Sequence, residues 1–429
     1  MLQELFEYPF IIRIFNKIFN DNDKIKIISL NKILNNKRSK FTYDKELKNT
    51  ETYKNEWFYD CLKYVITDKI IKFPNSIEYL IFGEDFNENF NSYFPIPVTN
   101  LKIGNEFNKT SIPKSIKYLI LGGDFNQDIQ NCLPNSIKYL KFGYHFNQNI
   151  RNCIPNSVKR LTFGFSFNQP IEGYIPNSVK YLIFGNLFNK NIQNCLPNSI
   201  KYLVFGFQFN QSIKNSIPNS VTNLTFGYYF NRKIKGRIPN SVKYLIFGNL
   251  FNKNIQNSVP NSVIYLKFGF SFNQPIFNSV PNSVKYLKFG RQFNQNIQNC
   301  IPKSVTHLKI GGNVNFIPDS VTHLRFVYNF NQNIQNIIPN FVIYLKFGHN
   351  FNQNIENCIP DSVEYLIFGH WFDQNVDCLP NSIISLTFDA KFLRKVTKFP
   401  SCLKTLKASK NFYELNKDVI STDIKIKFV

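Results

Sequence analysis

The sequence predicts a mainly β repeat solenoid, in which about seventeen units of about 21 residues form an arc with a parallel sheet on its inner face. A proline opens each repeat, and from Pro113 to Pro302 the step between prolines is 21 residues without exception. The stretch IPNSVKYLIFGNLFNKNIQN occurs twice, at 175–194 and at 238–257. A fixed period of this length indicates a solenoid whose repeats bury their apolar faces only against their neighbours.

Each repeat is expected to contain one short strand and an extended return. Counting from proline as position zero, apolar residues recur at +3, +6, +8, +12, +16 and +20. Positions +6 and +8 alternate with +5 and +7, which is the period of a strand with one buried face. Glycine at +9 ends the strand or permits a tight bend, and proline lies outside the strand because it cannot donate to a sheet. Rungs stacked at the ~4.8 Å spacing of strands would give an arc of roughly 80 Å.

The repeat boundaries divide the chain into four segments. Residues 74–410 form the predicted solenoid, and 51–73 contain a linker and a degenerate first turn, because LKYVI at 62–66 resembles the strand sequence of the repeat. The motif is lost from residue 411, where STDIKIKFV alternates like a last strand that covers the open end. Residues 411–429 are therefore predicted to be a C-terminal cap.

Residues 1–50 do not follow the repeat and are predicted to be a small helical domain. Apolar residues at helical spacing follow Pro9, and Asp23 can cap a second short helix. One interpretation is a cap, because an open rung exposes its core and its strand edge.

The motif FNQNI followed by IPNSV resembles the FNIP repeat, a relative of leucine-rich repeats found mainly in social amoebae and giant DNA viruses. This resemblance covers about 74–410 and implies a leucine-rich-repeat-like solenoid of a kind that mostly binds proteins. The order Pro-x-Ser-Val-x-x-Leu-x-Phe also resembles the short leucine-rich repeats of bacterial effectors. Those repeats place asparagine at +11, whereas this chain has it at +13, as in Asn147, Asn189 and Asn252. We therefore expect a differently built loop after the strand, in which an ordinary asparagine ladder is not assured.

The N-terminal segment also resembles an F-box, because YP precedes an apolar helix, a polar turn and the stretch ISLNK. The resemblance implies docking onto the adaptor of a cullin-type ubiquitin ligase. Tyr8 stands where an F-box has leucine, and no tryptophan follows closely after Lys32, so either difference would weaken docking. The residues that match the adaptor-binding positions are Pro9, Ile11, Ile14, Phe15, Ile18 and Leu30.

The net charge of +23 predicts an acidic partner, which could be a nucleic acid, an anionic membrane surface or an acidic protein. No run of ~18 apolar residues is present, so no membrane span is expected. The first residues carry acids where a signal peptide has a basic region. We therefore expect a cytoplasmic protein, in the host cytoplasm if it is viral, with its eight cysteines reduced.

The sequence offers no constellation for catalysis or for a cofactor. The span 113–355 holds only four acids, which are spread over three repeats, and it contains no nucleotide-binding, zinc-protease or hydrolase motif. Serine at +2 recurs in nearly every repeat, so we interpret it as a structural residue that caps backbone donors beside proline. We predict that the protein is not an enzyme.

Cysteines and histidines also recur in columns. Six cysteines lie just before a proline, where we expect small structural side chains. His307 and His323 share position +5, and His349 and His370 share position +10. Such pairs could hold a metal, but no other ligand column completes the coordination sphere, so histidine replacing tyrosine is favoured. The six cysteines are Cys132, Cys153, Cys195, Cys300, Cys358 and Cys378.

Positions +5 and +7 are predicted to point away from the core, along the inner face of the arc. Tyrosine recurs at +5, and position +7 is cationic in five consecutive repeats. Across 113–355, 25 lysines and arginines accompany the four acids, a stronger bias than solubility requires. The predicted partner-binding residues are Tyr139, Tyr181, Tyr202, Tyr244, Tyr265, Tyr286, Lys267, Lys288, Lys309, Arg325, Lys346, His307 and His323.

We therefore predict a non-catalytic solenoid that captures an acidic protein partner on this face, with tyrosine as anchor and lysine as cation. If the F-box resemblance holds, the protein is a substrate receptor of a cullin-type ubiquitin ligase. The alternative is a solenoid that binds single-stranded nucleic acid, in which the same tyrosines stack on bases and the lysines hold phosphates.

Overall fold

A computed structural model describes residues 64–67, 77–83, 98–105 and 112–429, with the backbone alone at 64–67. The chain divides into two compact units. Unit 1 comprises residues 1–190 and 195–200, and unit 2 comprises residues 191–194 and 201–429.

Every strand from β2 to β18 begins five residues after the proline that opens its repeat, as the alternation predicts. We call one repeat with its strand a rung. The strands of unit 1 are β1 Tyr64–Thr67, β2 Tyr79–Phe82, β3 Asn100–Lys102, β4 Tyr118–Ile120, β5 Tyr139–Lys141, β6 Arg160–Thr162 and β7 Tyr181–Ile183. The elements of unit 2 are β8 Tyr202–Val204, β9 Asn223–Thr225, β10 Tyr244–Ile246, β11 Tyr265–Lys267, β12 Tyr286–Lys288, β13 His307–Ile310, β14 His323–Phe326, β15 Tyr344–Lys346, β16 Tyr365–Ile367, β17 Ser385–Thr387, β18 Thr405–Ala408, α5 Lys410–Asn416 and β19 Lys425–Phe428.

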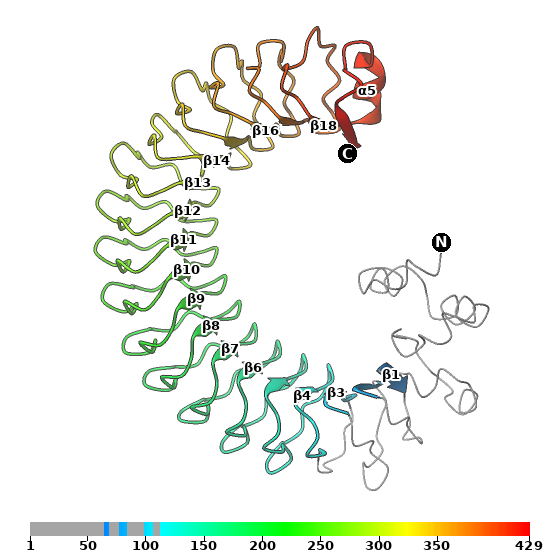
Figure 1. Cartoon of the computed structure of the whole chain (residues 1–429). Coiled ribbons are helices and arrows are strands. Elements are labelled where there is room, and N and C mark those ends of the chain that lie inside the picture. The colour runs from blue at the N-terminus through cyan, green and yellow to red at the C-terminus, as the bar shows by residue number, and fades with distance from the viewer. Residues whose placement is uncertain (1–63, 68–76, 84–97, 106–111) are drawn as a thin grey trace, which may run out of the picture. The chain divides into compact units, whose positions relative to one another are not determined.

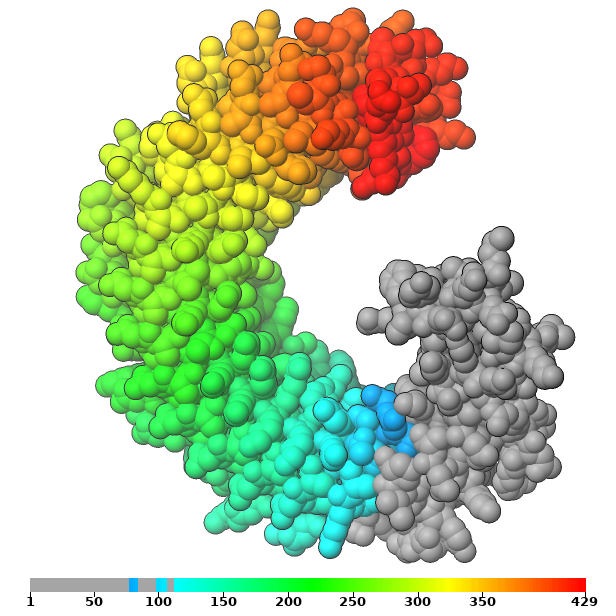
Figure 2. Space-filling view, in the orientation of Figure 1, coloured from blue at the N-terminus to red at the C-terminus, as the bar shows by residue number. Residues whose placement is uncertain are grey.

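The strands pair in parallel and in chain order, from β1 to β7 in unit 1 and from β8 to β19 in unit 2. Equal repeat positions face each other, so Tyr265 pairs with Tyr286 and Lys267 with Lys288. In unit 2 the strands line the concave side and the loops lie on the outside (Figure 1). The space-filling view shows the rungs of unit 2 packed in continuous contact (Figure 2).

Two columns of phenylalanine fill the core. Within one rung the rings of Phe205 at +8 and Phe209 at +12 lie 3.9 Å apart. Between rungs, the Phe209 and Phe230 rings lie 6.2 Å apart. Every described phenylalanine at +12 is at most 2% exposed, which confirms the predicted register. The rung that opens at Pro302 differs, because buried Val314 takes this position.

Glycine at +9 is explained by close approach rather than by a bend. A β-carbon on Gly227 would lie 1.6 Å from the carbonyl oxygen of Gly206, and one on Gly248 would lie 1.6 Å from that of Gly227. Neither residue has a positive φ. In the rungs of Gly227 and Gly248 the backbones of successive repeats therefore meet where only a residue without a side chain fits.

An asparagine ladder forms at +13, which the sequence comparison did not assure. The side-chain oxygen of Asn126 accepts the backbone N–H of Asn147 at 2.8 Å, and Asn147 accepts that of Asn168 at 2.8 Å. In unit 2, Asn210 and Asn231 continue the pattern at 3.0 Å. Because each side-chain oxygen accepts a backbone N–H of the next rung, the ladder fixes the distance between successive loops.

Serine at +2 makes a different contact from the one expected. Ser178 donates its hydroxyl to the carbonyl of Val158, in the preceding rung, at 2.7 Å, and Ser241 donates to Val221 at 2.7 Å. These serines therefore join rungs and do not cap local donors beside proline.

Position +18 makes a left-handed turn before the next proline, a feature that the sequence reasoning missed. Asn215 and Asn257 have φ of 52° and 51°, and Gly236 has φ of 66° in the same column. Asparagine and glycine are the residues that adopt this conformation most readily. Their alternation at one position was the signal that would have revealed the turn.

Both predicted terminal strands are present. β1 pairs with β2, and β19 pairs with β18. The helix α5 was not predicted. Its buried Phe412 lies 5.3 Å from Phe388 and 5.4 Å from Phe392, measured between ring centroids, so the helix closes the end of the phenylalanine columns.

Candidate functional site

The exposed strand face of unit 2 carries cations at position +7 in five successive rungs. Lys267 pairs with Lys288, Lys288 with Lys309, Lys309 with Arg325, and Arg325 with Lys346. Each of these strands begins with an aromatic side chain two residues earlier, because the +5 column here is Tyr265, Tyr286, His307, His323 and Tyr344. We call these ten residues the cationic face.

The cations of this face are not neutralised by neighbouring acids. None of them takes part in an ion pair seen among the described residues. Partial desolvation, together with the positive charges of Lys267, Lys288, Arg325 and Lys346, holds the pKa of Lys309 below its ordinary value. The four neighbouring charges disfavour the protonated form of Lys309, so an anion placed over this residue would be stabilised.

Aromatic rings hold two of the cations in place. Lys288 donates to the hydroxyl of Tyr265 at 3.1 Å, with its ammonium 4.9 Å from the centre of the ring. The guanidinium of Arg325 lies 4.9 Å from the centre of the Tyr344 ring. These cation–π contacts restrict the charged side chains without removing them from solvent.

The histidines occupy the middle of the aromatic column. The rings of His307 and His323 stack with centroids 4.1 Å apart, and Nδ1 of each lies 3.0 Å from the hydroxyl of the preceding threonine. Desolvation lowers the pKa of both, and the charges of His323, Lys288 and Arg325 lower that of His307 further. Both rings therefore bind a proton less readily than a free imidazole, which favours the neutral form at neutral pH.

The predicted residues do not all belong to one unit. Unit 2 holds eleven of them, and its Tyr244, Tyr265 and Tyr286 rings follow one another at 6.1 and 6.2 Å. Tyr202 lies on β8 of the same unit. In unit 1, Tyr139 and Tyr181 flank Arg160, whose guanidinium lies 5.5 and 5.9 Å from their ring centres.

A second exposed column at +10 follows the ends of the strands. Tyr328, His349 and His370 stack at centroid distances of 4.2 and 4.6 Å, which agrees with histidine replacing tyrosine. Nδ1 of His370 lies 2.7 Å from a carboxylate oxygen of Asp389. The described residues contain no group of three or more side chains placed to hold a metal.

The shortened rung at Pro302 opens a hollow that the sequence reasoning did not foresee. The hollow has a volume of about 780 Å³ and is lined by residues that include Phe270, Arg291 and Asn313. Gly312 has no side chain in the +10 column, and the Arg291 guanidinium lies 4.4 Å from the Tyr328 ring centre. The signal in the sequence was the length of this repeat, because Pro302 and Pro318 are five residues closer than the usual 21.

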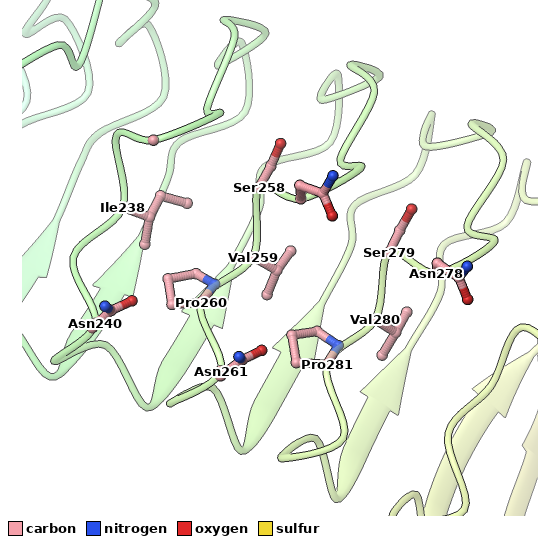
Figure 3. A pocket seen from close by; sticks show the side chains of 12 residues that line it. Ile238, Asn240, Ser258, Val259, Pro260, Asn261, Asn278, Ser279, Val280 and Pro281 are labelled. Atoms are coloured by element: carbon pink, nitrogen blue, oxygen red, sulfur yellow. The ribbon is translucent and has the colours of Figure 1, made fainter.

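A smaller hollow of about 370 Å³ lies among the turns before successive prolines (Figure 3). Ser258, Val259 and Pro260 in one rung have the same places as Ser279, Val280 and Pro281 in the next (Figure 3). The hollow is therefore produced by the repeat and does not single out one place on the molecule.

The cysteine side chains, which could be chemically reactive, make structural contacts. The seven described cysteines are free thiols. Burial raises the pKa of Cys153 and of Cys195, so both stay protonated at neutral pH. In the described part of the chain, no helix combines the length and the apolar character that crossing a membrane requires.

Comparison with known proteins identifies a repeat family and similar solved structures. The FNIP Repeat family matches residues 105–145, 146–187, 188–229, 230–271, 272–313, 293–329 and 330–371. The crystal structure of CroV588, described as a novel circular LRR protein, is 31% identical, with a TM-score of 0.61 over 91% of this chain and 78% of that chain. YopM from Yersinia enterocolitica WA-314 is 14% identical, with a TM-score of 0.42 over 86% of this chain and 85% of that one.

A search of curated proteins finds no match. The repeat and the parallel strand of each rung make the chain a leucine-rich-repeat-like solenoid, and the matched segments cover more than half of its length. The chain belongs to the FNIP repeat family.

Proposed function

We propose that this protein is a non-catalytic binding scaffold whose cationic face captures an acidic protein partner. Solenoids of the leucine-rich-repeat type typically bind proteins. The observation that carries the proposal is the run of five register-paired cations from Lys267 to Lys346, beside a continuous aromatic column. The charges steer an acidic partner, and the rings supply contact area that costs little conformational entropy.

Charge reversal tests this proposal. The variant Lys288→Glu, Lys309→Glu and Arg325→Glu should lose the proteins that the wild type captures from a cell lysate, as quantified by mass spectrometry. The fold should persist, because these side chains point to solvent. The outcome against the proposal is equal capture by this variant and the wild type.

The matched control reverses three loop lysines of unit 2. Lys214→Glu, Lys233→Glu and Lys235→Glu change the net charge by the same amount, and all three side chains are exposed on loops. This variant should keep its partner. A salt titration with an oligo-dT strand adds a nucleic-acid arm, because phosphate binding falls steeply with salt concentration. Tight oligo-dT binding at 0.15 M salt would favour the alternative of a single-stranded nucleic-acid-binding solenoid.

The F-box resemblance extends the proposal to a substrate receptor of a cullin-type ubiquitin ligase. Its support is the sequence alone, namely the YP pair followed by the apolar run and ISLNK. Pro9, Ile11, Ile14, Phe15, Ile18 and Leu30 lie outside the described residues. In this proposal the N-terminal segment binds the ligase adaptor, while the cationic face holds the protein to be modified.

A further inference from the structure

The spacing of the cationic face restricts the shape of the acidic partner. Neighbouring parallel strands lie about 4.8 Å apart, so the five cations are spread over about 19 Å along the stack. A partner that pairs with all five must present carboxylates at nearly this interval. The cations and the aromatic rings are two residues apart on each strand, so the two columns run in parallel about 6.7 Å from one another.

We propose that the cationic face recognises an acidic amphipathic α-helix lying along the stack, across the strands. This inference rests on the proposed function. A helix advances about 5.4 Å per turn, so carboxylates on one face follow at nearly the interval of the cations. Over four steps the mismatch accumulates to about 2.4 Å, which flexible lysine stems can absorb. Carboxylates at i, i+4, i+7 and i+11 give the first four positions of this stripe, and one at i+14 gives the fifth.

An extended acidic peptide fits less well. Side chains on one face of a strand repeat about every 6.7 Å, so over four steps an extended chain would fall out of phase with the cations by about 8 Å. It therefore cannot pair with all five cations at once. Neighbouring cations on the strands lie about 4.8 Å apart, so a cation without a carboxylate partner would keep its repulsion from its neighbours.

The aromatic column specifies the second stripe of the helix. A helix with its side chains is about 10–12 Å wide and therefore covers both columns at once. Consecutive residues project about 100° apart around the axis, so apolar residues at i+1, i+5, i+8 and i+12 would meet Tyr265, Tyr286 and Tyr344. Acidic residues at one position and apolar residues at the next are thus the predicted recognition pattern.

Two synthetic peptides of identical composition test the inference. One places glutamate at i, i+4, i+7 and i+11 and leucine one residue after each, and the other alternates glutamate and leucine with the period of a strand. Fluorescence anisotropy with the full chain at 0.15 M salt should give a Kd about tenfold lower for the helical peptide. Its affinity should fall for the Lys288→Glu, Lys309→Glu, Arg325→Glu variant and persist for the variant at Lys214, Lys233 and Lys235.

The possible outcomes separate this inference from the proposed function. Equal affinity for both peptides, lost in the first variant alone, would overturn the helical partner and leave acidic capture standing. A proline in the middle of the helical peptide should abolish its advantage, and an unchanged Kd would also count against the helix. Binding of neither peptide, or binding that survives the charge reversal, would overturn the inference together with the proposed binding face.

Discussion

At the scale of the residue, each position of the repeat is defined by what the next rung places against it. The backbone carbonyl of Gly206 occupies the space in which a side chain at position 227 would lie. Asparagine at +13 is held by the N–H that it accepts from the next rung, and serine at +2 by the carbonyl to which it donates. These residues therefore recur in the sequence because each makes a contact with a neighbouring rung.

Replacement of Gly227 by alanine should lower the free energy of unfolding by about 1–3 kcal/mol, because backbone atoms must move to admit the methyl group. The control is Gly236→Asn in the same rung. Gly236 has φ of 66° with open space around its α-carbon, and Asn215 and Asn257 adopt this conformation in neighbouring rungs. Urea unfolding should show a large loss for the first variant and little change for the second, and equal losses would contradict the explanation by close approach.

The sequence predicts burial at the residue scale better than it predicts polar contacts. The burial of Phe209 could be predicted from the repeat period alone, because a column of large apolar side chains is expected to lie in the core. The partners of Ser178 and Asn147 were not foreseen, since a polar side chain can satisfy a local or a neighbouring group equally well. That choice depends on how closely the rungs stack, which one repeat by itself does not reveal.

At the scale of the element, β13 and β14 differ from the other strands of the cationic face by beginning with histidine. Both rings lie among cations, with Lys288 on β12 and Arg325 on β14 as the charges that act on His307. The folded pKa of each histidine is below the ordinary value, so the folded protein binds fewer protons than the unfolded chain between that lower pKa and about 6.5.

Stability should therefore fall as the pH is lowered from 7 through this window, and it should level off below the folded pKa. Affinity for an acidic partner should change in the opposite direction, because protonation adds charge to the face. The double variant His307→Tyr and His323→Tyr should lose both responses. Thermal unfolding and partner binding between pH 5 and 7.5 measure them, and an unaltered pH dependence in the variant would assign it to other groups.

Strand positions were predictable because the period-two alternation is local, whereas the helix α5 was not expected beyond the last repeat. Its N-cap Ser409 accepts the N–H of Phe412 at 3.1 Å, and Asn416 donates to the carbonyl of Arg394. A serine three residues before a buried aromatic was the available indication. The hollow beside Arg291 could not be predicted for another reason, because the length of a repeat does not by itself show how the neighbouring loops are arranged.

At the scale of the whole molecule, a solenoid must protect both ends of its core. At the C-terminal end the structure shows how, with Phe412 covering Phe388 and Phe392 and buried Asn416 accepting the N–H of Val396 at 2.7 Å. A capping role and an adaptor-binding role for residues 1–50 make different predictions about stability and binding.

The variant Ile14→Asp with Phe15→Asp separates these two roles, because it places two charges among the apolar residues that match the F-box. If the segment docks a ligase adaptor, the full chain should bind purified adaptor, and this variant should lose that binding while it keeps partners captured by the cationic face. If the segment is a cap, wild type should not bind adaptor, and the variant should melt at a lower temperature. The control Asn16→Asp with Asn20→Asp adds the same charge at polar positions and should change neither measurement.

Absence of adaptor binding by the wild type would refute the substrate-receptor proposal. Capture of an acidic partner by unit 2 would not be affected by that result, because the cationic face lies wholly within residues 265–346.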